Sequence, residues 1–507
     1  MTCMKYVIGI DLGTSSVKVI LVSKEGEVKQ TVTKEYPIIH EKPGYSEQDP
    51  EQWVLQTLQA LTELVQLSAV PSSDIEGLSF SGQMHGLVLL NREDKVIRPA
   101  ILWNDTRSTS QCLKIKKQLG SRLLEITKNP ALEGLTLPKL LWVQENEEEN
   151  FRNISVFLLP KDYLRFRLTG RIASEYSDAA GTLLLNIENL SWSTEIIQSL
   201  DLPKEICPPL VESGEFVGNL LPEIAGYTGL SVSTKVFAGG ADNACGAVGA
   251  GILSKGKALC SIGTSGVLLA YDKDSSRTLN ANVHFFNHIE KDSYYKMGVT
   301  LAAGYSLRWF KQTFMESENF SSLLEKAGES SVGANYLLFT PYLIGERTPH
   351  ADSKIRGTFT GINGTHRKQD FVRAVIEGIV FSIHETLQVF RSNGPAIDTI
   401  ISIGGGAKSD LWLQIQADIF DAKIIKLNND QGPGMGAAMI AATGLGWFNT
   451  LKECASKHVS ISYSYYPIQE NVNKYKKLYQ LYKDIYTQTA SINHQLFDLN
   501  QINNQTY

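Results

Sequence analysis

The chain has 507 residues, of which 43% are hydrophobic and 20% are charged, and its formal net charge is −5. This length is too great for one hydrophobic core, so we expect about two or three domains of an ordinary globular protein. The nearly balanced charge argues against a nucleic-acid or membrane surface, and no apolar stretch approaches the length of a membrane span.

Two features bear on the compartment. The N-terminal run "KYVIGID" reads directly as a strand and lacks the basic region, apolar core and cleavage site of a signal peptide. The six cysteines form no CxxC pair, and the nine histidines have no metal-ligand spacing. We therefore expect a cytoplasmic protein without a disulfide or structural zinc framework.

The first half of the chain predicts strands alternating with helices. Strands at 6–11 and 17–23 flank the turn Gly13-Thr14-Ser15, and a third strand follows at 28–36. A helix begins at Pro50 with Asp49 as its cap. The segment "IEGLSFSG" (75–82) reads as a buried strand, with shorter strands at 86–91 and 100–105.

The second half repeats this style. A strand at 235–240 leads into a small-residue helix, and strands at 257–263 and 266–272 form a hairpin around Thr264. A long helix at 369–390, a strand and glycine loop at 399–410 and a final amphipathic helix follow. The tyrosines on one face of the final helix, Tyr475, Tyr479, Tyr482 and Tyr486, are expected to form core packing. The two halves are weakly similar, which predicts an α/β protein with two like domains facing a central cleft.

The repeated Gly-Thr-Ser turn is the first candidate binding element. Glycine lets the backbone approach a ligand, and successive N–H groups and hydroxyls can hold phosphate oxygens. One copy alone is more typical of a plain hairpin than of a binding site, whereas two copies from two domains could grip one polyphosphate. Asp11 ends the strand before the first turn and could hold Mg²⁺ through water. The predicted phosphate-binding residues are Gly13, Thr14, Ser15, Lys18, Gly263 and Thr264.

Other glycine-rich segments exclude the common nucleotide motifs. "GILSKGKA" has Ala258 where a P-loop needs Ser or Thr, and "GPGMGAA" lacks the spacing of a dinucleotide fingerprint. The glycines of 432–438 and 404–409 instead predict helix starts suited to the phosphates and ribose of an adenine nucleotide. Ser409 or Asp410 is expected to cap the helix that follows.

Polar residues at strand ends form the second candidate group. Asp242 follows the strand 235–240 and precedes Asn243, although an aspartate there is also a common helix cap. Met84 and His85 follow the strand 75–82 between two glycines. "LWNDTR" supplies an aromatic ring, an amide, an acid and a guanidinium at Trp103, Asn104, Asp105 and Arg107, a combination suited to a sugar.

These segments together resemble the FGGY family of carbohydrate kinases, and within it the branch that phosphorylates xylulose. The matching runs include "IGIDLGTSSVKVIL", "YSEQDPEQW", "SGQMHG", "LPKDYLRFRLTG", "GGADNACGAVGAG" and "PYLIGERTPH", and the two long family signatures lie at 134–146 and 357–377. The resemblance implies two actin-, hexokinase- and Hsp70-like (ribonuclease H-like) domains, here residues 1–241 and 242–507. We expect the last helix, near 468–490, to pack back on the first domain.

The resemblance also implies roles for single residues. Asp242 matches the catalytic base, Met84 and His85 the sugar-binding pair, and Asp11 the acid near Mg²⁺. Gly405, Gly406 and Ser409 fall in the adenosine segment. The implied reaction is ATP-dependent phosphorylation of D-xylulose to D-xylulose 5-phosphate. Ala241 and Ser16 replace glycines often seen in the family, which removes no functional group.

Three alternatives remain open, one within the same family and two from other classes of protein. Another sugar kinase of the same family could act on a different ketose or polyol. An Hsp70-like ATPase would need a β-rich peptide-binding region, and a sugar-sensing regulator would need a DNA-binding helix-turn-helix before the first strand. Sugar-stimulated release of ADP distinguishes the three. Dimers are common in the family, so a homodimer is one expected assembly, and neither nucleic acid nor a membrane is an expected partner.

Overall fold

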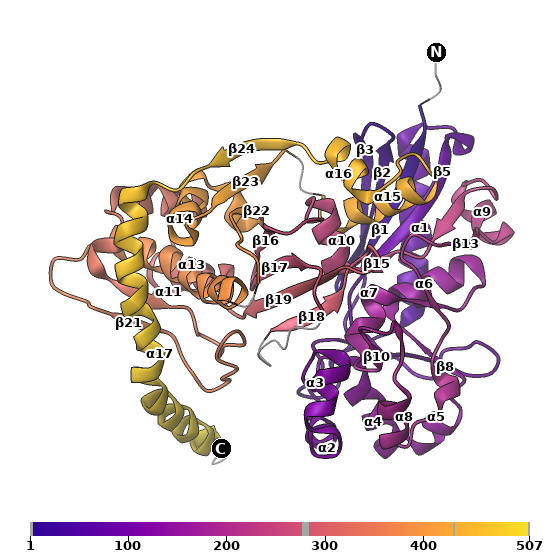
Figure 1. Cartoon of the computed structure of the whole chain (residues 1–507), viewed down its shortest axis with the longest axis horizontal. Coiled ribbons are helices and arrows are strands. Elements are labelled where there is room, and N and C mark those ends of the chain that lie inside the picture. The colour runs from indigo at the N-terminus through magenta and orange to yellow at the C-terminus, as the bar shows by residue number, and fades with distance from the viewer. Residues whose placement is uncertain (1–3, 276–282, 393, 429–430, 505–507) are drawn as a thin grey trace.

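The computed structural model describes residues 4–275, 283–392, 394–428 and 431–504 of the protein. Two seven-stranded mixed sheets form its core, one from each half of the chain (Figure 1). Helices cover the outer faces of both sheets, and further helices lie between them. Among the helices of the described residues, none combines the length and the apolar character that a membrane span requires.

The first sheet confirms the predicted N-terminal meander. Strands β1 and β2 pair antiparallel with Asp11 opposite Lys18, β3 continues the meander, and β5 joins β1 in parallel. The helix α1 (Pro50–Ser68) packs on β2 and β3, and Asp49 caps it by accepting the N–H of Glu51 as predicted. The strands are β1 (Tyr6–Leu12), β2 (Ser16–Ser23), β3 (Val28–Glu35), β5 (Ile75–Gly82), β13 (Phe216–Asn219), β14 (Lys235–Phe237) and β15 (Gly240–Ala241).

The second sheet confirms the predicted hairpin around Thr264. Strands β16 and β17 pair antiparallel, and β16 lies in parallel beside β22. Its strands are β16 (Lys257–Ile262), β17 (Gly266–Asp272), β18 (His284–Asn287), β19 (Tyr294–Thr300), β22 (Thr399–Gly404), β23 (Lys423–Leu427) and β24 (Ile461–Tyr465). The helices of this half are α11 (Gly304–Phe314), α12 (Phe320–Glu329), α13 (Lys368–Ser392), α14 (Asp410–Phe420), α16 (Leu451–His458) and α17 (Gln469–Asn504).

Shorter elements complete the first half beside and below its sheet (Figure 1). A separate apolar cluster holds several of them together, with Leu137, Leu140 and Leu141 fully buried in it. The helices are α2 (Thr109–Leu119), α3 (Ser121–Thr127), α4 (Thr136–Asn146), α5 (Glu148–Arg152), α6 (Pro160–Thr169), α7 (Tyr176–Ala179), α8 (Thr194–Ser199) and α9 (Pro222–Thr228). The short strands here are β4 (Glu47–Gln48), β6 (Val88–Leu90), β7 (Ala100–Ile101), β8 (Val156–Leu158), β9 (Ser174–Glu175), β10 (Leu185–Asn186), β11 (Ser191–Trp192) and β12 (Leu210–Val211), while β20 (Leu338–Thr340) and β21 (Thr358–Thr360) belong to the second half.

Two helices join the halves. Helix α10 (Asp242–Gly249) crosses α15 (Pro433–Gly444), and α15 also packs on β1 and β5 of the first sheet although it comes from the end of the chain. The helices approach so closely that a Cβ on Gly436 would lie 1.9 Å from the carbonyl oxygen of Cys245. A Cβ on Gly9 in β1 would lie 2.0 Å from the carbonyl oxygen of Gly434. The small residues here therefore set the distance between the halves.

The last helix corrects one expectation. Its aromatic face, with Tyr475, Tyr479 and Tyr482, is buried in the apolar cluster that also contains α13 and α14. Tyr475 further donates a hydrogen bond of 2.6 Å to Glu377 of α13. The tyrosines form core packing, as their spacing predicts, but α17 packs on the second half of the chain and does not return to the first domain. The reason is that α13 and α14 present the matching aromatic and apolar surface.

Replacing Gly436 by Ala should destabilise the protein, because the new methyl group meets a backbone carbonyl that cannot give way. We expect the free energy of unfolding to fall by about 2 kcal/mol or more, the usual cost of overpacking. Gly226→Ala is the matched control, since this helical glycine of α9 has nothing within 4 Å of its Cβ position. The free energy of unfolding of Gly226→Ala should rise by about 0.5–1 kcal/mol. Urea unfolding of both variants measures the difference, and equal shifts would contradict the close crossing.

Candidate active site

Two acids, one at the end of β1 and one at the start of α10, define the centre of the site. Burial raises the pKa of Asp11 to about 6, although the nearby Ser81 hydroxyl and the charge of Lys18 oppose the rise. Burial also raises the pKa of Asp242 to about 7, and the neighbouring charge of Asp11 adds to that rise. Two carboxyl groups that interact electrostatically in a poorly hydrated site do not ionise independently. Such a site favours a cation or a proton between them.

Asp242 and Asn243 link the centre to Met84. One carboxylate oxygen of Asp242 accepts the backbone N–H of Asn243 at 2.6 Å and its side-chain amide at 2.9 Å. The same amide reaches the sulfur of Met84 at 3.5 Å. Asp242 is the first residue of α10, and the capping position belongs to Ala241, which has no side-chain cap. Asp242 therefore does not occupy the capping position, although one of its oxygens accepts an N–H of the first turn.

The backbone before Asp242 is held by buried polar groups. The hydroxyl of Ser177 accepts the N–H of Ala241 at 3.0 Å and donates to Glu175 at 2.7 Å. Glu175 in turn belongs to a fully buried ionic cluster with Lys161, which lies 3.4 Å from it. Buried groups of this kind fix geometry because leaving any of them unpaired is costly. The position of Asp242 thus depends on residues that lie behind it.

We expect Ser177→Ala to lower the free energy of unfolding by about 2 kcal/mol, because the buried N–H of Ala241 loses its acceptor. Ser213→Ala is the matched control, since Ser213 also donates to Glu175, at 2.8 Å, and is also buried. Ser213→Ala should lower the free energy of unfolding by only about 1 kcal/mol, because it leaves no backbone N–H without an acceptor. Urea unfolding of the two variants tests this, and a larger effect at Ser213 would contradict the assignment.

His85 lies beside Met84 in a strained and fixed geometry. Its φ is +69°, and its backbone carbonyl accepts hydrogen bonds from Lys139 at 2.9 Å and from Thr136 at 3.1 Å. Ring nitrogen Nδ1 lies 2.9 Å from the carbonyl oxygen of Gly181, which can only accept. Burial, together with the positive charge of Lys139, holds the pKa of His85 well below its usual range. The ring is therefore neutral, with its proton on Nδ1 and Nε2 left as an acceptor.

The three residues of the segment 103–105 differ in exposure and in their contacts. The Trp103 side chain is 42% exposed, and Asn104 is also exposed. Asp105 is buried, and both of its oxygens are engaged, by Arg107 at 2.7–3.0 Å and by the N–H of Ser46 at 2.6 Å. The structure therefore brings Trp103 and Asn104 to an accessible position, whereas Asp105 supports the loop that carries them.

The first Gly-Thr-Ser turn is held from two sides. Its Thr14 hydroxyl accepts the indole N–H of Trp103 at 2.9 Å, and its Thr14 carbonyl accepts the Gln48 amide at 2.7 Å. The Ser15 carbonyl accepts the N–H of Tyr36, whose own hydroxyl donates to the carbonyl of Gly13 at 2.5 Å. Lys18 reaches across to the carbonyl of Gln431, just before α15, at 3.3 Å. The turn, Asp11 and the start of α15 thus lie together.

The second turn and the glycine loop line one cavity of about 470 Å³. Gly263 and Thr264 line it from the hairpin, and Gly405 and Gly406 line it from the short helix after β22. Arg308 and Lys408 add positive charge, and Arg308 donates to the Thr264 hydroxyl at 3.2 Å. Ser409 has a different position, because it caps α14 by accepting the N–H of Trp412. Four of the predicted nucleotide residues are therefore brought together.

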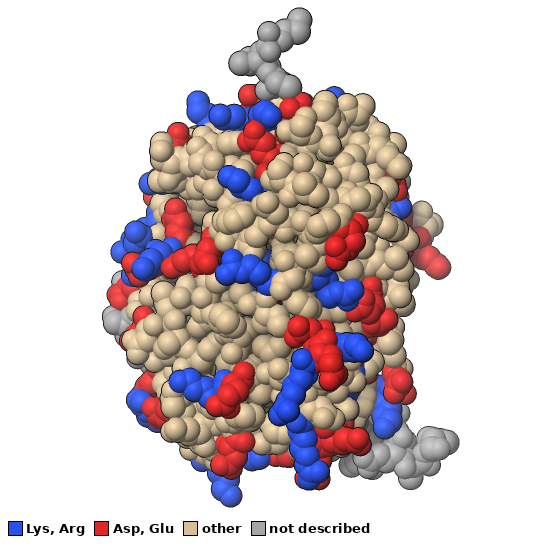
Figure 2. Space-filling model, turned by 90° about the vertical axis from the view of Figure 1, so that its right-hand side faces the viewer, with Lys and Arg blue, Asp and Glu red and all other residues tan. Residues whose placement is uncertain are grey.

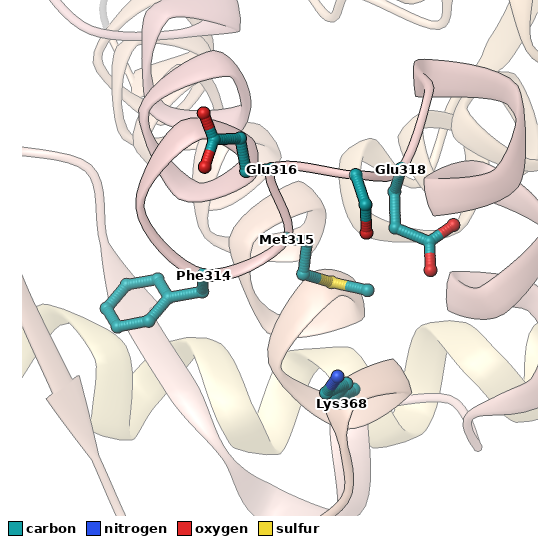
Figure 3. A pocket seen from close by; sticks show the side chains of 6 residues that line it. Phe314, Met315, Glu316, Glu318 and Lys368 are labelled. Atoms are coloured by element: carbon teal, nitrogen blue, oxygen red, sulfur yellow. The ribbon is translucent and has the colours of Figure 1, made fainter.

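Another hollow does not offer a comparable site. It measures about 450 Å³ and lies between the end of α11 and the start of α13. Figure 3 shows that the side chains of Glu316 and Glu318 point in different directions. Glu318 is already paired with Lys326 and Ser322.

The space-filling view of the outer face of the first half shows acidic and basic side chains interspersed, without a patch of one sign (Figure 2).

Several residues of the site escaped prediction from the sequence. Gln48 and Gln83 hold each other at 3.2 Å beneath the first turn, and Glu346 receives backbone N–H groups of Leu301 and Arg347. Burial raises the pKa of Glu346 to about 7. Lys139 also went unnoticed, and burial lowers its pKa to about 7. Gln48, Gln83 and Glu346 lie inside the quoted runs "YSEQDPEQW", "SGQMHG" and "PYLIGERTPH", and Lys139 lies in the family signature at 134–146. These runs marked the segments without indicating the contacts.

Comparison with known proteins identifies the class. Residues 6–249 match the N-terminal domain, and residues 258–445 the C-terminal domain, of the FGGY family of carbohydrate kinases. The chain belongs to this family, and the actin-like fold of two α/β domains is confirmed by its structural relatives. A xylulose kinase from Brucella ovis superposes with a TM-score of 0.90 at 35% identity, covering 96% of this chain and 100% of that one.

Individual relatives are more specific. The xylulose kinase of Bacillus subtilis is 60% identical over 97% of this chain and 98% of its own length. The xylulose kinase of Escherichia coli is 38% identical over 93% of this chain and 98% of its own length. The gluconokinase of Bacillus subtilis is 27% identical over 96% of this chain and 98% of its own length.

Proposed function

We propose that the protein is an ATP-dependent xylulokinase that converts D-xylulose to D-xylulose 5-phosphate. The single observation that carries this proposal is the 60% identity to a xylulose kinase over 97% of the chain. The geometry supports it, because Met84, His85, Asp242 and Asn243 lie at one end of the same site as the first phosphate turn. We also propose that the domains divide at residues 241 and 242, between β15 and α10.

The sugar would bind between the exposed face of Trp103 and the Met84–His85 pair. A sugar presents C–H groups to an aromatic face and hydroxyls to polar partners. Because His85 is neutral with its proton on Nδ1, its Nε2 accepts a sugar hydroxyl rather than donating to it. Asn243 and Asn104 supply amides for the remaining hydroxyls. This arrangement discriminates among sugars by which of their groups donate and which accept hydrogen bonds. A hydrophobic pocket cannot discriminate in this way.

ATP would lie along the second half of the site, with its adenosine in the cavity of about 470 Å³ at Gly405 and Gly406. The two Gly-Thr-Ser turns then hold the phosphates from opposite sides through N–H groups and hydroxyls. Because burial makes the Asp11 carboxylate costly to ionise, a nearby hard cation such as Mg²⁺, held through water, would favour its charged form. When bound with the nucleotide, Mg²⁺ would neutralise phosphate charge.

The chemistry assigned to Asp242 is that of a general base. As the terminal hydroxyl oxygen of the sugar forms its bond to the γ-phosphorus, the bond from that phosphorus to the bridging oxygen breaks and ADP leaves with the electron pair. The hydroxyl proton passes to the Asp242 carboxylate. In a loose transition state most of the rate comes from alignment, and the raised pKa of Asp242 makes it a better proton acceptor than an ordinary aspartate.

Asp242→Asn should therefore lose kcat by about 10²–10⁴-fold, the usual contribution of a positioned acid or base. The amide keeps the size of the side chain but cannot take the proton. Binding of ATP, measured by calorimetry, should change little because the nucleotide residues lie elsewhere. Near-normal turnover of the variant would remove Asp242 from the role of base.

The substrate itself is tested by the rate of ADP release with a panel of acceptors. We expect D-xylulose to give the highest kcat/KM, and D-ribulose, D-fructose, gluconate, glycerol and xylitol to give lower values. The difference from gluconate is the sharpest comparison, because a gluconokinase is among the relatives. A higher kcat/KM for any other acceptor would overturn xylulose as the substrate while leaving a sugar kinase in place.

A further inference from the structure

A hydrogen bond joins the sugar end of the site to the phosphate end. The indole Nε1–H of Trp103 donates to the hydroxyl oxygen of Thr14 at 2.9 Å, although the two residues are 89 positions apart. Trp103 lies in the segment assigned to the sugar, and Thr14 lies in the first phosphate turn. The contact is the direct physical connection between two groups that the proposed function treats separately.

The direction of this bond is fixed by chemistry. An indole N–H can only donate, so the Thr14 oxygen must accept. The hydroxyl proton of Thr14 is then free to point elsewhere, and among the described residues no acceptor receives it. A phosphate oxygen can only accept. Trp103 therefore orients Thr14 as a donor toward the nucleotide, and hydrogen bonds arranged in series in this way strengthen one another.

The two residues differ in how firmly they are held. The backbone around Trp103 is fixed, because Leu102 donates its N–H to Ser46 and Ser46 donates to the buried Asp105. Trp103 is 42% exposed, so the protein covers more than half of its surface and leaves the rest open to a ligand. Thr14 is fixed through its carbonyl by Gln48 at 2.7 Å, while its hydroxyl is free to rotate. A ligand that rests on the open part of the ring would add to the restraint on its orientation.

We propose that Trp103 is a positioning residue that couples occupancy of the sugar site to nucleotide binding through Thr14. The proposal rests on the proposed function. A sugar stacked on the ring holds the indole N–H on Thr14, and Thr14 then presents its proton to a phosphate. Without sugar the open part of the ring lacks this restraint, so the indole N–H holds the Thr14 hydroxyl less firmly. The two substrates therefore assist each other's binding, by equal factors in both directions.

The test compares wild type with Trp103→Phe, which keeps an aromatic face and removes the N–H. The dissociation constant of ADP is measured by calorimetry with and without saturating D-xylulose. In wild type the sugar should tighten ADP by about fivefold, the worth of one hydrogen bond. In Trp103→Phe this factor should fall to near one. The dissociation constant of the sugar alone should stay within about twofold, because stacking on the ring persists.

Two further variants distinguish coupling from a general loss of structure. Trp447→Phe is the matched control, since the Trp447 indole also donates a bond of 2.9 Å, to Glu76, and is also partly buried. It should keep the full coupling. Thr14→Val removes the acceptor, so adding Trp103→Phe to it should cause no further loss of coupling. An additional loss in the double variant would show that Trp103 acts by another route and would overturn the proposal.

The outcomes also separate this inference from the proposed function. If wild type phosphorylates D-xylulose and Trp103→Phe keeps the wild-type coupling, the inference fails and the function stands. If another acceptor of the panel is the true substrate, xylulose fails as the substrate, and the same comparison with that acceptor decides the inference.

Discussion

The close crossing of α10 and α15 determines where the functional groups of this protein lie. Gly436 allows α15 to meet the backbone of α10 at Cys245, and Gly9 allows the same helix to meet β1. One consequence is that the start of α10, with Asp242, lies near the end of β1, with Asp11. A larger residue at these contacts would separate the two sheets. The active site therefore depends on packing between residues that take no part in its chemistry.

The second consequence is electrostatic. Asp11 and Asp242 lie where protein replaces water, so each carboxylate is costly to ionise and each raises the cost for the other. Such a pair lowers the stability of the folded protein. Its presence is useful only if a cation and a proton acceptor are needed at one place. Ser177 and the buried ionic cluster behind it hold the backbone that carries Asp242. The hydrogen bond from Trp103 to Thr14 links the proposed sugar side of the site to the proposed nucleotide side.

The sequence allowed the prediction of most elements and of the residues with direct chemistry. Alternation of apolar residues and turn chemistry predicted the meander, both hairpins, the helix capped by Asp49 and the tyrosine face of α17. Family runs marked Asp242, Met84 and His85. Long-range contacts could not be predicted in this way, because nothing local in "YSEQDPEQW" indicates that Gln48 holds Thr14 or that Ser46 donates to Asp105. The position of α17 depended equally on distant surfaces, namely those of α13 and α14.

The central claim is that Asp242 and Asp11 form a coupled, poorly hydrated pair, and titration of the Asp242 carboxyl tests it most directly. Carbon-13 NMR of protein with labelled aspartate, assigned through Asp242→Asn, follows this carboxyl across the pH range. The account predicts that the pKa of Asp242 is about 7 in wild type and falls when Asp11→Asn removes the neighbouring negative charge. An Asp242 carboxyl that titrates near its ordinary value of 3.8 in both proteins would contradict it.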